Sequence, residues 1–279
     1  MKIIGADERL AERRGVKALI VGPAGVGKTS LLRTVDPART LFVDVEAGDL
    51  SVQDVPVDTI RLDDWPAARD LACRIGGPNP SFPLTACYSQ AHYEAVGGPL
   101  ENLERYDTIF VDSITAVSRL SFRWVEQQPE AFSERTGKKD TRGAYGLLGR
   151  EMINWFHQLQ HARGKNVIFV AILEKVVDEL NGTTWQPQME GARTGRELPG
   201  ILDELITMQW ISFEGNTVPV RAFVCTSPNS WGYPGKDRSG LLEQFEKPHL
   251  GELIEKLTRP SQRKPFLVSP PESTLKAAE

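Results

Sequence analysis

The sequence predicts an α/β fold in which helices flank a mostly parallel central sheet, with antiparallel strands added at an edge near the C-terminus. Two observations support this fold class. Short apolar runs alternate along the chain with segments of helical periodicity, as they do in consecutive βαβ units. One of these runs leads directly into a glycine-rich stretch of the kind that joins a strand to a helix.

Five of the apolar runs are short enough to be buried strands of such a sheet. In chain order they are Ala18–Val21, Leu41–Val45, Thr108–Val111, Val167–Ile172 and Leu205–Ile211. Two later stretches, Val218–Cys225 and the neighbourhood of Trp231–Tyr233, are expected to form antiparallel strands or hairpin arms at one edge. Because parallel sheets bind ligands at the carboxyl ends of their strands, functional residues are sought there.

Two helices are indicated by apolar stripes at helical spacing. Their stripes are Leu148, Met152, Phe156, Leu159 and Leu250, Leu253, Ile254, Leu257. Residues 16–258 are expected to form one domain, after an extension over 1–15. Residues 259–279 are rich in proline, serine and charge, which predicts a disordered tail.

Composition sets wide bounds on function. The 279 residues carry a net charge of −4, so composition alone neither supports nor excludes nucleic acid as a partner. There is no apolar run long enough for a transmembrane helix. Three scattered cysteines favour reduced thiols and a cytoplasmic protein.

A phosphate-binding loop is the strongest signal in the chain. Residues 22–30 match the pattern G-x-x-x-x-G-K-[ST] and lie between an apolar strand and an apolar helix. The nucleotide-binding residues are Gly22, Pro23, Ala24, Gly25, Val26, Gly27, Lys28, Thr29 and Ser30. Glycines let backbone N–H groups surround a phosphate, and the start of the following helix adds a positive dipole end. We expect Lys28 to reach the β- and γ-phosphates of ATP, and Thr29 to bind Mg²⁺.

Asp112 is the expected second ligand of the magnesium shell. It ends a buried strand, and a carboxylate at that end would face the phosphate-binding loop. The alternative is that Asp112 only caps a helix beginning at Ser113.

Glu46 is the favoured base for activating water, because it follows the strand Leu41–Val45 and should emerge at the same sheet edge. Asp44 is a second candidate, although strand alternation directs it to the face opposite Val45. A surface carboxylate without a role is the remaining interpretation of Glu46.

These parts together resemble the RecA-type P-loop ATPase core: a phosphate-binding loop, a strand followed by an acidic residue, and a strand ending in Asp-Ser. The resemblance implies that Glu46 activates the attacking water. In most AAA+ proteins the base directly follows the aspartate of the second strand, whereas here Ser113 follows Asp112. By the same resemblance Glu174 occupies the place of a γ-phosphate sensor, or pairs with a nearby cation such as Lys175.

RecA-like oligomers often carry two cations, two residues apart, on a late hairpin that reaches the neighbouring subunit's ATP site. Lys236 and Arg238 have this spacing and would point the same way on a strand. The resemblance therefore implies a homo-oligomer in which they stabilise transition-state charge, a contribution of about 10³–10⁵ in rate in other P-loop enzymes. The alternative is a solvated pair of charges in a turn.

The wider chain resembles phage-encoded RecA-like nucleotide-binding proteins, some of which are single-strand annealing recombinases. The segments that carry this likeness, within residues 16–258, are 106–115, 142–150, 197–200 and 231–240. Counterparts of the additional DNA-binding domains of bacterial RecA are not recognised in the sequence.

The RecA resemblance also implies two DNA-binding loops, over about 129–146 and 177–200. Their candidate cations are Arg135, Lys138, Lys139, Arg142, Arg193 and Arg196. Tyr145 and Trp185 could add stacking on bases. Both segments also contain acids, and ordinary polar loops are the alternative.

The sequence thus predicts a magnesium-dependent ATPase acting on single-stranded DNA in phage recombination or replication, stimulated by that DNA. A single-strand-binding or other replication protein is a further candidate partner. Two alternatives stay open: an ATP-switched assembly or loading factor that binds a protein, and a ring helicase motor.

Overall fold

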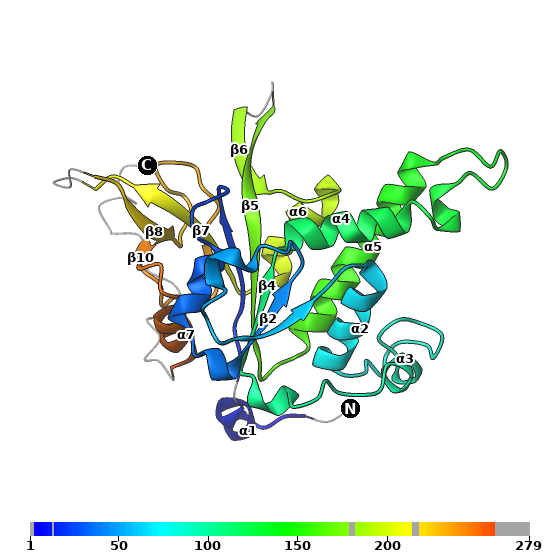
Figure 1. Cartoon of the computed structure of the whole chain (residues 1–279), viewed down its shortest axis with the longest axis horizontal. Helices are drawn as coiled ribbons and strands as arrows, with labels where there is room; N and C mark the ends of the chain where they lie inside the picture. Colours follow the sequence, from blue (N-terminus) through cyan, green and yellow to red (C-terminus); the bar gives the residue numbers. More distant parts are fainter. Residues whose placement is uncertain (1–2, 13, 179–181, 214–217, 260–279) are drawn as a thin grey trace, which may run out of the picture.

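The computed structural model describes residues 3–12, 14–178, 182–213 and 218–259, and in these parts it has a single sheet with helices on both faces (Figure 1). The strands are β1 (Lys17–Gly22), β2 (Thr40–Asp44), β3 (Asp58–Arg61), β4 (Thr108–Asp112), β5 (Asn166–Asp178), β6 (Gly182–Pro187), β7 (Glu204–Ile211), β8 (Val220–Val224), β9 (Lys236–Asp237) and β10 (Phe245–Glu246). The helices are α1 (Ala6–Ala11), α2 (Trp65–Gly76), α3 (Gln90–Ala95), α4 (Ile114–Val125), α5 (Thr141–Gln160), α6 (Ala192–Ile201) and α7 (Leu250–Thr258). Short 3₁₀ turns are η1 (Thr29–Thr34), η2 (Pro37–Arg39), η3 (Asp49–Val52), η4 (Leu103–Arg105) and η5 (Pro129–Ala131).

The strand order confirms a mostly parallel sheet with an antiparallel edge. Along the sheet it runs β10-β8-β7-β1-β5-β4-β2-β3, and the six consecutive strands β7, β1, β5, β4, β2 and β3 are parallel to one another. β8, within the predicted stretch Val218–Cys225, is antiparallel to β7, and β10, which the sequence did not predict, is antiparallel to β8. β6 and β9 pair off this path with β5 and β7. The strand carrying the phosphate-binding loop is therefore separated from β4 by one strand, β5.

Each central strand buries both of its faces, and alternate residues enter two different cores. Leu19 and Val21 pack on the face covered by α2, α4, α5 and α6, whereas Ala18 and Ile20 pack on the face covered by η1, η3 and α7. The continuous apolar runs of the sequence follow from burial on both faces. The predicted stripe of Leu148, Met152, Phe156 and Leu159 lies in α5 and is buried.

In the predicted neighbourhood of Trp231–Tyr233 the antiparallel strand is β9, three residues further along, whereas residues 231–233 themselves form no strand. The side chain of Asn229 explains the difference. Its Oδ1 accepts hydrogen bonds from the backbone N–H groups of Trp231, at 3.2 Å, and Tyr233, at 3.1 Å. Those donors are then unavailable to a strand ladder, as in other asparagine-centred turns.

β5 is much longer than the predicted run Val167–Ile172. Beyond Ile172 it pairs antiparallel with β6, and the two form a hairpin that rises clear of the sheet (Figure 1). The segment 177–200 is consequently a hairpin and the helix α6, with residues 179–181 outside the described part. The segment 129–146 contains η5, an arm bridged between Phe132 and Lys139, and the start of α5.

The phosphate-binding loop leads into the six-residue 3₁₀ turn η1, where the sequence predicts an α-helix. The Leu31 N–H donates to the Lys28 carbonyl three residues earlier, at 3.1 Å, and the Thr34 hydroxyl donates to the Leu31 carbonyl at 2.6 Å. The turn stops before Asp36, because Pro37 disfavours helical geometry in the residue that precedes it. Leu31 and Leu32 are nevertheless buried.

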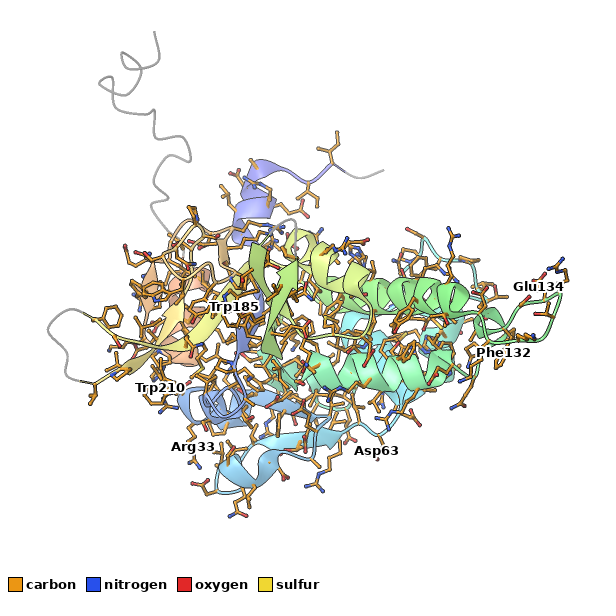
Figure 2. All side chains as sticks on the ribbon, turned by 90° about the horizontal axis from the view of Figure 1, so that it is seen from above. Arg33, Asp63, Phe132, Glu134, Trp185 and Trp210 are labelled. Carbon is orange, nitrogen blue, oxygen red and sulfur yellow. The ribbon has the colours of Figure 1, made fainter. Side chains whose placement is uncertain are left out.

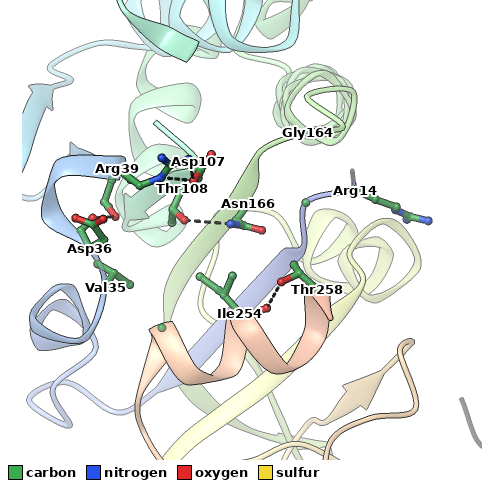
Figure 3. A pocket seen from close by; sticks show the side chains of 13 residues that line it. Arg14, Val35, Asp36, Arg39, Asp107, Thr108, Gly164, Asn166, Ile254 and Thr258 are labelled. Carbon is green, nitrogen blue, oxygen red and sulfur yellow. Dashed lines mark hydrogen bonds and ion pairs between the residues drawn. The ribbon is translucent and has the colours of Figure 1, made fainter. Parts of the chain in front are cut away.

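A hollow of about 200 Å³ lies at the amino ends of the strands, between α7 and residues such as Thr108 and Asn166 (Figure 3). There Asn166 Nδ2 donates to Thr108 Oγ1 at 3.1 Å, and Arg39 pairs with Asp107. This edge is opposite to the one that carries Gly22–Ser30. None of the described helices is both long and apolar enough to cross a membrane.

Candidate functional site

The phosphate-binding loop leaves the carboxyl end of β1 and is closely fitted to its surroundings. Gly25 and Gly27 have φ angles of +77° and +98°, in the region that favours glycine. At Gly22 a Cβ atom would stand 2.5 Å from the Met208 carbonyl oxygen, so a side chain there would push β1 and β7 apart. The loop therefore has the backbone geometry that directs N–H groups at an anion.

Lys28 lies at the base of this loop and is only 9% exposed. Its ammonium donates to the carbonyl oxygens of Gly22, at 2.9 Å, and Pro23, at 3.0 Å. Burial lowers the pKa of Lys28, and the carboxylates of Asp112 and Glu46 act in the opposite direction. A largely desolvated cation in a nest of N–H groups is well placed to bind polyphosphate.

Thr29 and Asp112 meet across β5. The Thr29 hydroxyl donates to Asp112 Oδ2 at 2.5 Å, which joins the phosphate-binding loop to the end of β4. Burial raises the pKa of Asp112 to about 6, the Thr29 bond lowers it, and the charge of Glu46 raises it. Capping of α4 falls to Ser113, whose Oγ accepts from the Ala116 N–H at 3.2 Å, so the alternative role proposed for Asp112 is filled by its neighbour.

The pair Thr29–Asp112 fits a magnesium ion. Mg²⁺ prefers oxygen ligands, and proteins hold it through one or two carboxylates or hydroxyls together with substrate phosphates. The pKa of Asp112 is raised because burial outweighs the opposing charge of Lys28, so further positive charge would stabilise the ionised carboxylate. A divalent cation between Thr29, Asp112 and the phosphates would supply that charge.

Glu46 reaches this pair from β2. It is exposed to solvent, and its carboxylate accepts a hydrogen bond from Ser113 Oγ, beside Asp112. Asp44 is buried on the same face as Asp112 and the loop, opposite to Val45 as alternation predicts. Its Oδ1 accepts from the N–H groups of Glu46, at 3.2 Å, and Gly48, at 3.4 Å, so Asp44 shapes the turn that carries Glu46.

Lys236 and Arg238 lie at the opposite edge of the sheet, where β9 pairs with the amino end of β7. Lys236 donates to the carbonyl oxygens of Pro199 and Leu202. Arg238 donates to Asp203 Oδ1 and to the Gly200 carbonyl, both at 3.0 Å. The two side chains point the same way, as predicted, but toward the end of their own chain's α6, where cations are favourable. The role in a neighbouring subunit stays a prediction.

Replacing Arg238 with alanine should separate the two roles. We expect a loss of unfolding free energy of about 0.2–1 kcal/mol, because the ion pair is partly exposed, and no change of ATP turnover in the isolated chain. Turnover should fall only at concentrations where chains associate. Urea unfolding and turnover measured against protein concentration check both points. Arg14→Ala, which also removes a partner of Asp203, is the control, and equal loss of turnover in a dilute monomer would contradict a role between subunits.

Glu174 lies on β5 beyond the level of Gly22, and its Oε1 accepts from Gln186 Nε2 of β6 at 2.8 Å. It does not pair with Lys175, whose ammonium stands 6.0 Å from the centre of the Trp185 ring. The hairpin thus places an amide beside the residue predicted to sense the γ-phosphate.

The candidate DNA-binding cations do not converge. Arg135, Lys138 and Lys139 are exposed on the arm whose tip carries Phe132 and Glu134, at one end of the molecule, while Trp185 lies near the middle (Figure 2). Arg142 and Arg196 are exposed on α5 and α6. Arg193 lies in α6, with its side chain outside the described part.

The aromatic residues expected to stack on bases have protein partners. Tyr145 is 42% exposed but stacks on Phe122, with ring centres 5.0 Å apart. Trp185 packs edge-on against Tyr233, with ring centres 5.4 Å apart.

Arg221 is a residue of this site that the sequence reasoning missed. Its guanidinium donates to the Val26 carbonyl at 3.5 Å, and a Cβ atom on Gly27 would lie 2.5 Å from Arg221 Nη1. Arg221 is about 200 positions from the loop and belongs to no motif. Only the pairing of β8 with β7 brings the two together.

The fold and the arrangement of Lys28, Thr29 and Asp112 are those of a P-loop ATPase. Within that class, the chain belongs to the family described as AAA domain, whose model matches residues 14–239. The sequence differs from the usual AAA+ pattern, in which the base directly follows the aspartate, because Ser113 follows Asp112. The family is nevertheless described as AAA domain. In this chain the candidate base Glu46 follows the neighbouring strand β2 and accepts a hydrogen bond from Ser113.

Among solved structures, the chain is similar to a KaiC-like protein from the hyperthermophilic archaeon Pyrococcus horikoshii OT3. The two are 13% identical over 76% of this chain and 78% of that one, with a TM-score of 0.36. A search of curated proteins gives no match.

Proposed function

We propose that this chain binds ATP with Mg²⁺ at Gly22–Ser30, hydrolyses it with Glu46 as the base, and couples hydrolysis to single-stranded DNA. The enzymatic part rests on one observation: residues at the carboxyl ends of β1, β4 and β2 are in contact. Thr29, after β1, bonds to Asp112 of β4, and Ser113, after β4, bonds to Glu46, after β2. A phosphate-binding loop, two metal-ligand oxygens and a base are the parts that phosphoryl transfer to water needs.

The protein residues divide the work as follows. The loop N–H groups and Lys28 hold the phosphates and offset the charge that grows on the γ-phosphoryl oxygens. Glu46 accepts a proton from water as the water oxygen bonds to the γ-phosphorus, and the bond from that phosphorus to the bridging oxygen of ADP breaks. Ser113 orients the Glu46 carboxylate by donating to it. Thr29 and Asp112 would hold Mg²⁺, which supplies positive charge to the phosphates when it is bound.

Support for single-stranded DNA comes from two features at the carboxyl edge of the sheet. The β5–β6 hairpin continues the strand that separates Thr29 from Asp112, and the bridged arm before α5 presents Lys138 and Lys139 to solvent. Exposed cations near aromatic rings suit phosphate contact and base stacking. Phage recombination or replication is the setting that the resemblance implies.

Single-stranded DNA is expected to raise ATP turnover, and the effect should weaken with salt. Replacing Lys138 and Lys139 together with alanine should reduce DNA affinity and lower the salt dependence by about 0.7 in slope per lost phosphate contact. Binding titrations at several salt concentrations, beside turnover with and without DNA, measure this. Lys247→Ala is the matched control, because Lys247 is also highly exposed but lies next to α7. If ATP turnover is unchanged by DNA and no salt-sensitive binding is found, the proposed role on DNA is contradicted, while the proposed ATP hydrolysis is not.

A protein partner is the second candidate, favoured by the apolar edge at β8. Val220 is 38% exposed, Val218 65% and Trp231 39%, all on the antiparallel side of the sheet. An ATP-switched loading factor would use such an edge. Unchanged turnover with DNA, together with intact ATP hydrolysis, would favour this function over the first.

A further inference from the structure

The direction in which ATP lies across the loop follows from the positions of the acids. Asp112 ends β4 and Glu46 follows the end of β2 by two residues, and both strands lie on one side of β1. If hydrolysis occurs as proposed above, the γ-phosphate must face that side, because the water and its base are there. The nucleoside must then leave the loop on the other side of β1, toward β7 and β8.

That side presents an aromatic ring and a cation. Trp210 of β7 and Arg221 of β8 are directly paired across the antiparallel ladder. They continue the alternation of Met208 and Phe223, which are buried on the face that carries the loop. Trp210 and Arg221 therefore project from the face of the sheet on which the loop and η1 lie.

Both side chains are accessible next to the loop. Trp210 is 52% exposed and lies far from the arm of Phe132 (Figure 2). The Arg221 guanidinium stands 5.4 Å from the centre of the Trp210 ring, between the indole and the Val26–Gly27 peptide. Within the described residues its guanidinium makes one long hydrogen bond, to Val26, so most of its five donors are available to a ligand.

We propose that Trp210 and Arg221 bind the nucleoside end of the nucleotide. The Trp210 indole stacks on the base, and Arg221 donates to the phosphate nearest the nucleoside. Stacking on an aromatic face accepts any base, because every base has a π-face. Arginine suits both neighbours, because its planar guanidinium stacks on rings and pairs with phosphate oxygens. This inference rests on the proposed ATPase function, since that function sets the direction of the triphosphate.

The test compares ATP with tripolyphosphate, a ligand that has the phosphates and lacks the nucleoside. Calorimetric titration with magnesium is carried out on the full chain and on Trp210→Ala, Trp210→Phe and Arg221→Ala. We expect Trp210→Ala to weaken ATP about tenfold and to leave tripolyphosphate unchanged, and Trp210→Phe to restore most of the affinity. Arg221→Ala should weaken both ligands. Trp231→Ala is the control, because Trp231 is also an exposed tryptophan but packs on Tyr233 and Phe245.

The outcomes separate this inference from the function on which it rests. Wild-type chain that binds neither ligand overturns both. Wild-type chain that binds ATP, with Trp210→Ala and Trp231→Ala equal in affinity to it, overturns the inference and keeps the ATPase. The inference also fails if Trp210→Ala weakens tripolyphosphate as much as ATP. Circular dichroism and melting of each variant establish that it is folded.

Discussion

Replacing Lys28 with alanine is expected to lower ATP turnover by at least about 10²–10³, the usual effect of removing one donor that stabilises transition-state charge. The expected cause is specific. Lys28 is the buried cation beside the loop, and its ammonium lies within 3.0 Å of two loop carbonyls. ATP affinity should also fall, because the lost charge contacts phosphates in the ground state as well. Calorimetric binding and steady-state turnover measure the two effects separately.

Lys17→Ala is the matched control for Lys28→Ala. Lys17 is buried like Lys28, and burial lowers its pKa to about 8, but it lies at the amino end of β1, away from the loop. Its ammonium donates to the carbonyl oxygens of Gly15, Ala162 and Lys165. That variant should lose about 1–3 kcal/mol of unfolding free energy and keep ATP binding. Equal loss of ATP binding in both variants would mean that Lys28 acts through stability alone.

The variant Glu46→Gln is expected to bind ATP as well as the wild type, or better, and to lose about 10²–10⁴ in turnover. Glutamine keeps an oxygen that can accept from Ser113, so the position of the side chain should be preserved. It cannot take a proton from water, which is the cause of the lost turnover. Removing a negative charge near the triphosphate relieves repulsion, which is the cause of the retained affinity. Turnover and nucleotide affinity are measured on the same preparation.

Asp49→Asn controls for the loss of a carboxylate in the same region. Asp49 follows Glu46 by three residues and pairs with Arg61, at 2.8 Å, away from Asp112. Its turnover should stay within about twofold of the wild type, since it is not expected to touch water or phosphate. If Glu46→Gln hydrolyses ATP at the wild-type rate, another group must activate the water, and Glu46 is then a surface residue.

The phosphate-binding half of the site could be predicted because its parts are close in sequence. The loop consists of nine consecutive residues. The apolar runs before Asp112 and Glu46 identify two strands, and the geometry of parallel sheets predicts that these two carboxylates lie at the same edge as the loop. The contact between Thr29 and Asp112 spans 83 positions, yet strand order alone brings them to one edge. The same reasoning identified the long helix α5 from its apolar stripe.

What could not be predicted depends on side chains that compete with the backbone, or on distant pairing. The Asn229 side chain accepts hydrogen bonds from the N–H groups of Trp231 and Tyr233, which a strand would need. The antiparallel strand therefore begins later, at β9. Arg221 reaches the loop only because β8 folds back on β7. The length of β5 was missed because the charged residues Glu174, Lys175 and Asp178 interrupt the apolar run past Ile172, and the pattern of a solvated hairpin is a weak signal.

The unbroken run of β5 has a mechanical consequence. One continuous backbone bonds to β1 on one side and to β4 on the other, and then becomes an arm of the raised hairpin. A pull on that hairpin would be shared by both ladders, with no loop between them to absorb it. Force that a ligand applied to the hairpin would therefore be transmitted through β5 to the contact between Thr29 and Asp112.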